Sequence, residues 1–173
     1  MKLTIFLVFI LFFAQVNSKE VTNVFDVPAG SSTTMHKVVV NSYMYFGCEL
    51  DVSEYRNDGE WGPYFSLHYT DVSKEEAVAI HFTKSQDDFL VFNVTHREKR
   101  INTYEEKILT LKSISDVINM SMIWSNKVMY FDLADNTGQA SKFFVIAPEF
   151  KPEEASLSIS GAKGTYLCNS QKL

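Results

Sequence analysis

The sequence predicts an all-β protein, an antiparallel β-sandwich of jelly-roll type with one disulfide. Roughly nine or ten short apolar runs are separated by turn-forming residues every ~8–12 positions, a spacing typical of sandwiches and barrels. Aromatic residues make up 14% of the chain, and their side chains favour strands. Residues 157–160 alternate between apolar residues and serine, as in a strand with one buried and one solvated face.

Residues 1–18 are interpreted as a secretory signal peptide. Lys2 precedes an unbroken apolar run, residues 3–14, that is too short to span a bilayer comfortably. Cleavage after Ser18 would leave residues 19–173 as one secreted domain, a length that suits a single core. An uncleaved anchor is the alternative interpretation of the N-terminal run, and the sequence has no second run of membrane-spanning length.

The N-terminal half is expected to hold five strand regions, each rich in β-branched or aromatic residues. Residues 28–32 predict a turn within the first region, and residues 51–63, which include Trp61, predict a loop. In the third region, alternation places Phe65, Leu67 and Tyr69 on one face of the sheet and Tyr64, Ser66 and His68 on the other. The expected regions are residues 19–37, 37–50, 64–69, 77–82 and 89–94.

The C-terminal half predicts a hairpin, in which residues 120–124 and 128–133 flank a three-residue connection. Because the runs between residues 77 and 133 are the most apolar, they are expected to form the middle of the sheet. The other expected strands are residues 104–111, 143–146, 157–160 and 165–169.

Three segments in this half predict connections between strands. Residues 95–100 are basic and polar, and residues 161–164 contain two glycines, so both are interpreted as loops or turns. Residues 111–118 predict a short helical turn, because their apolar residues have helical spacing.

The two cysteines, Cys48 and Cys168, are expected to form a disulfide, because the secretory route is oxidising. Two free thiols are the alternative. In the chain-entropy model, a loop of this length is worth up to ~4.7 kcal/mol. The bond would place the two ends of the domain side by side, so N-terminal and C-terminal strands are expected to neighbour each other in one sheet.

Charge and motifs exclude several classes of function. The net charge of −5 argues against a nucleic-acid partner. The sequence has no glycine-rich phosphate loop, no paired-cysteine metal spacing and no nucleophile elbow. The histidines are irregularly spaced, at His36, His68, His81 and His96, so no metal site and no cofactor are expected. Within each of the acid pairs 75–76 and 105–106, the two side chains would point to opposite faces of a strand, so neither pair can act as one acid/base dyad. For want of a catalytic constellation, an enzyme is the third hypothesis and is not expected.

Two sequons, at Asn93 and Asn119, are candidate glycosylation sites in a secreted chain. Each is followed by a threonine or serine two residues later, with no proline between. Both are expected at strand ends, where a sugar could project into solvent.

Residues 80–82, a polar loop and residues 91–93 resemble the sugar site of galectins. The later segments 122–131, 143–146 and 157–161 resemble the last strands of galectin-like and other concanavalin-type lectin sandwiches, and the farnesoic acid O-methyltransferase-type domain of animal proteins. The resemblance covers about half of the chain and implies that His81 and Asn93 face a galactoside. Where galectins carry an asparagine and an arginine after the histidine, this chain has Thr83 and Ser85. The resemblance therefore supports the sandwich more than it supports galactoside binding.

The candidate ligand-binding residues are Trp61, Tyr64, His81 and Arg97. Sugar rings stack on exposed aromatic side chains, because their C–H faces are apolar while their hydroxyls need polar neighbours. The first hypothesis is a secreted, non-catalytic recognition module whose partner is a glycan or an extracellular protein surface, without stable membrane insertion. The alternative is a secreted β-barrel carrier of a small hydrophobic ligand, resembling a lipocalin, although the Gly-x-Trp of this chain, residues 59–61, lies far from the mature start.

Overall fold

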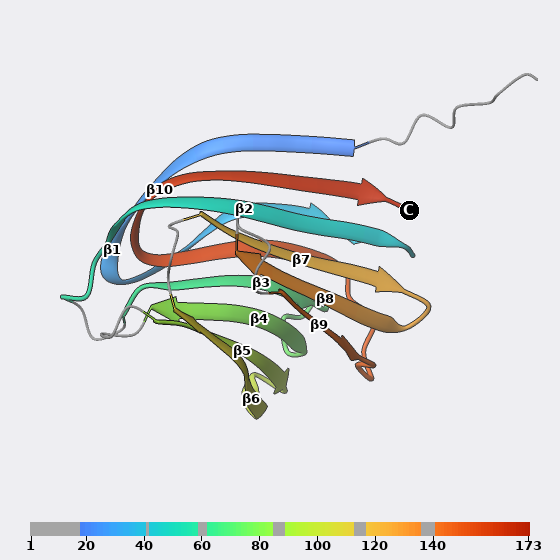
Figure 1. The fold of residues 1–173 in the computed structure, drawn as a ribbon. Coiled ribbons are helices and arrows are strands. Elements are labelled where there is room, and N and C mark those ends of the chain that lie inside the picture. Colours follow the sequence, from blue (N-terminus) through green and yellow to red (C-terminus); the bar gives the residue numbers. More distant parts are fainter. Residues whose placement is uncertain (1–17, 41, 59–61, 85–88, 113–116, 136–140) are drawn as a thin grey trace, which may run out of the picture.

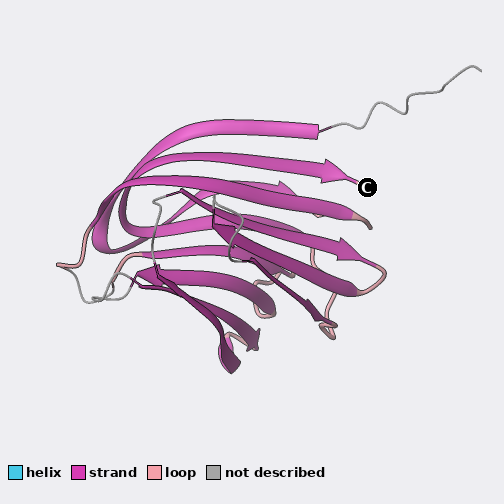
Figure 2. Ribbon diagram, in the orientation of Figure 1, coloured by secondary structure: helices cyan, strands magenta, loops and turns pink. Residues whose placement is uncertain are grey.

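The computed structural model describes residues 18–40, 42–58, 62–84, 89–112, 117–135 and 141–173, and these ranges are all-β (Figures 1 and 2). No helix that could cross a membrane occurs in them. Residues 1–17 of the expected signal peptide, and Trp61, lie outside these ranges. The strands are β1 (Ser18–Val39), β2 (Met44–Tyr55), β3 (Tyr64–Thr70), β4 (Ala77–Lys84), β5 (Phe89–Glu98), β6 (Ile101–Lys112), β7 (Val117–Ser125), β8 (Val128–Asp135), β9 (Ser141–Ile146) and β10 (Glu154–Lys172).

The strands form one antiparallel sheet in the order β6-β5-β4-β3-β10-β2-β7-β8-β9, and β1 also pairs with β10. The long strand β10 pairs with β3 through residues 154–160 and with β2 through residues 162–172, while β1 follows it along both halves. The sheet therefore curls over itself at β1 and β10 into two packed layers (Figure 1). We call them the β3 layer, formed by β3 to β6, and the β2 layer, formed by β2 and β7 to β9.

Glycines allow β1 and β10 to pass from one layer to the other. Gly161 has φ of 59° and Gly30 has φ of 72°, backbone angles that residues with a Cβ atom rarely adopt. The register of β1 on β10 shifts between Val27 and Ser32, where β1 bends. The turns expected at residues 28–32 and 161–164 are therefore bends within continuous strands, and those two predictions were wrong.

The core lies between the layers, and alternate residues of strands such as β2, β3 and β7 contribute to it. Phe65 of β3 stacks on Phe82 of β4 with ring centroids 4.5 Å apart, and both side chains are fully buried. The hydroxyl of Tyr69 lies 3.5 Å from the Met44 carbonyl oxygen and 3.4 Å from that of Met122, so this buried tyrosine donates across the layers. The faces predicted for residues 64–69 are confirmed by this packing.

The expected disulfide is confirmed. Cys48 of β2 and Cys168 of β10 are directly opposite in register, with an S–S distance of 2.06 Å and both side chains buried. The N-terminal and C-terminal strands are neighbours in one sheet, because β10 pairs with both β1 and β2. This pairing also corrects the expected centre of the sheet, which is β10 and its neighbours rather than the strands between residues 77 and 133.

Several predicted boundaries also change. The region 37–50 is two strands, because β1 ends at Val39 and the Val40 N–H donates to the Glu153 carbonyl oxygen at 2.8 Å before β2 begins. Strand β2 runs on to Tyr55, into the predicted loop. Likewise β5 continues to Glu98 and turns only at residues 99–100, which both have positive φ.

The helical turn expected at residues 111–118 was wrong at both of its ends. Residues 111–112 belong to β6 and residues 117–118 to β7, while residues 113–116 lie outside the described ranges. The predicted hairpin of β7 and β8 is confirmed, but its connection has two residues rather than three, because Ser125 belongs to β7 and pairs with Val128. It turns through Asn126 and Lys127, which have φ of 50° and 64°.

Candidate functional site

The outer face of the β3 layer is polar, yet many of its side chains are buried. Ser66 is fully buried, and Ala79 and Thr95 are only 8% exposed, although all three point away from the core. The same holds for the fully buried Ser160 of β10, the cross-strand partner of Tyr64. No second layer covers this face among the described strands, so the burial comes from neighbouring side chains on the same face. These side chains therefore form a sheltered polar surface.

A hollow of about 320 Å³ lies on this surface, and we call it the β3 hollow. Ala77 and Ala79 of β4 lie beneath it, and larger residues flank them on the neighbouring strands. This difference in side-chain size leaves the hollow above the two alanines. Register brings the polar residues together: Ala79 lies between His68 and Thr95, and Ala77 is opposite Arg97. The described residues lining the hollow are Tyr64, His68, Ala77, Ala79, His81, Thr95, Arg97 and Asn102.

Tyr64 and the two histidines form one connected group at one end of the hollow. The ring of Tyr64 lies 5.7 Å from that of His81, tilted by 56°. Its hydroxyl lies 3.5 Å from Nε2 of His68. Nδ1 of His81 in turn lies 3.5 Å from the hydroxyl of Thr95. These contacts hold an aromatic ring beside several hydrogen-bonding groups.

The environment keeps Tyr64 and His68 uncharged near neutral pH. Burial, with smaller contributions from the charges of Arg97 and His81, lowers the pKa of His68 to about 4. Burial raises the pKa of Tyr64, and this effect outweighs the opposing influences of Ser66 and Arg97. The phenol is therefore a hydrogen-bond donor, and the His68 imidazole carries one donor and one acceptor.

Arg97 supplies the positive charge of the hollow. Its Nε atom is buried and has no hydrogen-bond partner among the described residues. In the part of the chain that the structure describes, no carboxylate lies within ion-pair distance of its guanidinium. A buried donor without a partner costs free energy, so an incoming acceptor would be favoured here.

The structure brings together three of the four sequence-predicted ligand-binding residues, Tyr64, His81 and Arg97. The fourth, Trp61, lies outside the described ranges. Sequence reasoning missed His68 and Asn102. Alternation already placed His68 on the same face as Tyr64, and that signal could have found it. Nothing local in the sequence marks Asn102, because its place depends on its pairing with Arg97 across β5 and β6.

Both sequons lie inside strands, so the expectation that they lie at strand ends was wrong. Asn93 is the cross-strand partner of His81 in the middle of β5, and Asn119 is the third residue of β7. Both side chains are half-buried.

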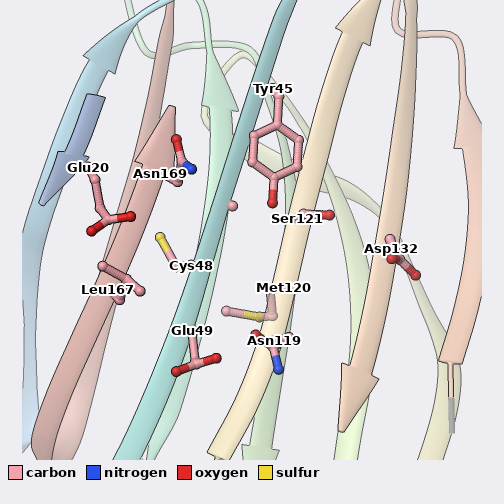
Figure 3. A pocket seen from close by; sticks show the side chains of 11 residues that line it. Glu20, Tyr45, Cys48, Glu49, Asn119, Met120, Ser121, Asp132, Leu167 and Asn169 are labelled. Atoms are coloured by element: carbon pink, nitrogen blue, oxygen red, sulfur yellow. The ribbon is translucent and has the colours of Figure 1, made fainter. Parts of the chain in front are cut away.

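A second polar hollow, of about 270 Å³, lies on the outer face of the β2 layer (Figure 3). The ring of Tyr45 lies over Gly47, where a Cβ atom would collide with the phenol. Around it, β1, β2, β7, β8 and β10 contribute acids and amides. These residues are Glu20, Glu49, Asn119, Asp132 and Asn169. This hollow therefore offers mostly acceptors, whereas the β3 hollow combines donors and acceptors.

Within the described ranges, no group of histidine, cysteine or acidic side chains could hold a metal ion. The described residues that line the β3 hollow include no carboxylate.

No known protein family matches this chain, and no curated protein matches its sequence. Solved structures share its fold at low identity. A legume lectin-like domain from Entamoeba histolytica is 12% identical, with a TM-score of 0.52 over 90% of this chain and 87% of that one. A functionally unknown protein from Saccharomyces cerevisiae is 7% identical, with a TM-score of 0.56 over 87% and 84%.

Part of a larger enzyme also has this fold. A β-fructofuranosidase from Schwanniomyces occidentalis is 9% identical, with a TM-score of 0.54 over 91% of this chain, which spans only 33% of that chain. At these identities the similarity shows the fold alone. The chain is thus a jelly-roll sandwich of the kind found in lectins and in domains of glycoside hydrolases.

Proposed function

We propose that this protein is a secreted, non-catalytic carbohydrate-binding module, and that sugar binds in the β3 hollow. The observation that carries the proposal is the composition of this hollow: an aromatic ring, neutral donors and acceptors, and one arginine above a floor of alanines. Sugars need such a mixture, because their hydroxyls both donate and accept while their C–H faces pack on aromatic rings. Similarity to lectin-like sandwiches supports the same proposal through the fold.

The filled interior favours an outer-face site over a hydrophobic carrier. Phe46, Phe65, Phe82, Phe92 and Phe131 are essentially fully buried between the layers. A lipocalin-like carrier needs an enclosed apolar space within a barrel, but here two layers close on each other through these side chains.

On this proposal, the β3 hollow binds sugar without hydrolysing it. Most glycosidases use two carboxylic acids that flank the scissile bond, and none is contributed by the described residues lining this hollow. The acids Glu20, Glu49 and Asp132 gather instead at the hollow of the β2 layer. Incubation with bound oligosaccharides should therefore release no new reducing ends, and release that disappears in Glu49→Gln would contradict a non-catalytic role.

A glycan-array screen of the disulfide-intact protein tests the proposal. Tyr64→Ala and His81→Ala should each lower binding at least ~10-fold, because each removes a ring and a hydrogen-bonding group from the hollow. Tyr45→Ala is the matched control, since it removes an aromatic ring from the opposite face. Thermal unfolding of each variant checks that it remains folded.

The outcomes separate the two faces. Binding that is lost in the Tyr64 and His81 variants and kept in the Tyr45 variant would support the β3 hollow. The reverse pattern would place the site in the hollow of Figure 3. A folded protein that binds no glycan would overturn carbohydrate binding altogether.

A further inference from the structure

Resting on the proposed function, we infer that the saccharide bound in the β3 hollow is acidic, and that its carboxylate or sulfate group pairs with Arg97. Tyr64, His81 and Thr95 would contact the neutral part of the same ligand.

Arg97 differs from the other two arginines of the chain. Arg56 pairs with Asp26 at 2.6 Å and with Glu54 at 3.0 Å, and Arg100 lies 3.9 Å from Glu75. Arg97 has no such acid among the described residues, and its buried Nε lacks a hydrogen-bond partner. A partly buried cation without an anion is unfavourable, because burial removes hydration that nothing replaces. A ligand anion would supply the missing partner.

Among the described residues that line the β3 hollow, none carries a negative charge that would compensate Arg97. The described lining residues are alanines, hydroxyl or amide side chains, the tyrosine and the histidines. The charge of Arg97 reaches His68, where it disfavours the protonated imidazole. Three acids, Glu76, Glu98 and Glu149, line a different, adjoining hollow of about 520 Å³, which shares Ala77 and Arg97 with the first. None of these described acids lies within ion-pair distance of Arg97, so an acceptor on the ligand would be favoured at the Arg97 end of the β3 hollow.

The register gives the ligand a direction. Along β4, His81 and Ala77 lie on either side of Ala79, and Arg97 is opposite Ala77. A sugar lying over Ala79 would have Tyr64 and His81 at one end, and Arg97 with Asn102 at the other. The planar guanidinium offers paired N–H groups that match both oxygens of a carboxylate or two oxygens of a sulfate.

Matched ligands, one with the anionic group and one without it, test this inference. Oligogalacturonate is compared with its methyl ester, and a sulfated galacto-oligosaccharide with its unsulfated parent, by calorimetric titration of the disulfide-intact protein. The acidic member of at least one pair should bind at least ~10-fold more tightly than its neutral partner. The pair that shows the difference identifies the anion as carboxylate or sulfate.

Arg97→Met should abolish that preference, lowering affinity for the acidic ligand at least ~10-fold and for the neutral one less than ~2-fold. Arg97→Lys should recover only part of it, because lysine keeps the charge but lacks the planar fork. Arg100→Met is the matched control, since it removes the same charge from an exposed position. Thermal unfolding confirms that each variant is folded.

Three results would overturn the inference. If the acidic and neutral members bind equally, and Arg97→Met weakens both alike, the module binds sugar without selecting charge, and the proposed function stands. If Arg97→Met and Arg100→Met weaken acidic ligands to the same extent, the attraction is general electrostatics rather than a site. If no saccharide of either pair binds and the glycan array is also empty, the proposed function fails with it.

Discussion

The imidazole of His68 makes the folded protein sensitive to acid. Its pKa in the folded protein is about 4, below the ordinary value of 6.5, because it is buried beside Arg97 and His81. As the pH falls from 6.5 toward 4, the unfolded chain takes up this proton and the folded protein does not. The free energy of unfolding therefore decreases across this window, by at most ~1.4 kcal/mol per pH unit.

Urea unfolding at pH 7 and pH 5 measures this effect. Between the two pH values the natural protein should lose about 1–2 kcal/mol more stability than His68→Gln, which cannot take up the proton. His36 and His96 also have pKa values lowered by burial, but they are present in both proteins and cancel in the comparison. Equal losses in the two proteins would contradict the assigned pKa of His68.

Alternation along the strand was enough to predict which side chains of β3 face outward. The odd-numbered residues of 64–69 are in the core and the even-numbered ones are on the outer face, as the pattern indicated. It was harder to predict which side chains of different strands lie close together, because this depends on the register of the strands. His68, Thr95 and Asn102 meet only after β3, β4, β5 and β6 are aligned, and β5 and β6 change register between Phe92 and Asn93 and again between His96 and Arg97. No local sequence signal specifies these shifts.

At the scale of the element, the bend in β10 shapes the molecule. Gly161 and Gly164 predicted a turn, because glycine is common in turns, although it also marks bends within strands. The structure distinguishes the two through long-range pairing: residues before Gly161 pair with β3, and residues after it pair with β2. The Arg56 N–H donates to the Gly161 carbonyl oxygen at 2.8 Å and holds this point in place. A single sequence contains no record of those partners.

Gly161→Ala should therefore destabilise the protein by at least ~1 kcal/mol. An alanine at this position would have to adopt φ of 59°, which residues with a side chain rarely do, and its Cβ atom would lie 3.0 Å from the Arg56 carbonyl oxygen. Gly62→Ala is the matched control, because its nearest neighbour would be 4.0 Å away. Denaturant unfolding of both variants makes the comparison, and equal stability of the two would show that the bend tolerates a side chain.

At the scale of the whole molecule, the disulfide closes a loop of 120 positions. It restricts the unfolded chain, so replacing both Cys48 and Cys168 with alanine should lower the free energy of unfolding by about 2–5 kcal/mol. Urea unfolding with and without reductant tests this. Reductant should destabilise the natural protein and leave the double variant unchanged, and a reductant effect on both would point to a cause other than this bond.

The pairing of β1 with β10 has a mechanical consequence. Ser18, at the start of β1, is opposite Gln171, near the end of β10, so tension between these two points pulls across the ladder rather than along it. Hydrogen bonds loaded in this way break one after another, and β1 should peel away at low force. The Cys48–Cys168 bond then stops the peeling of β10 from β2 after only a few residues. Under such tension, β1 would therefore separate from β10, whereas the disulfide would keep β10 attached to β2.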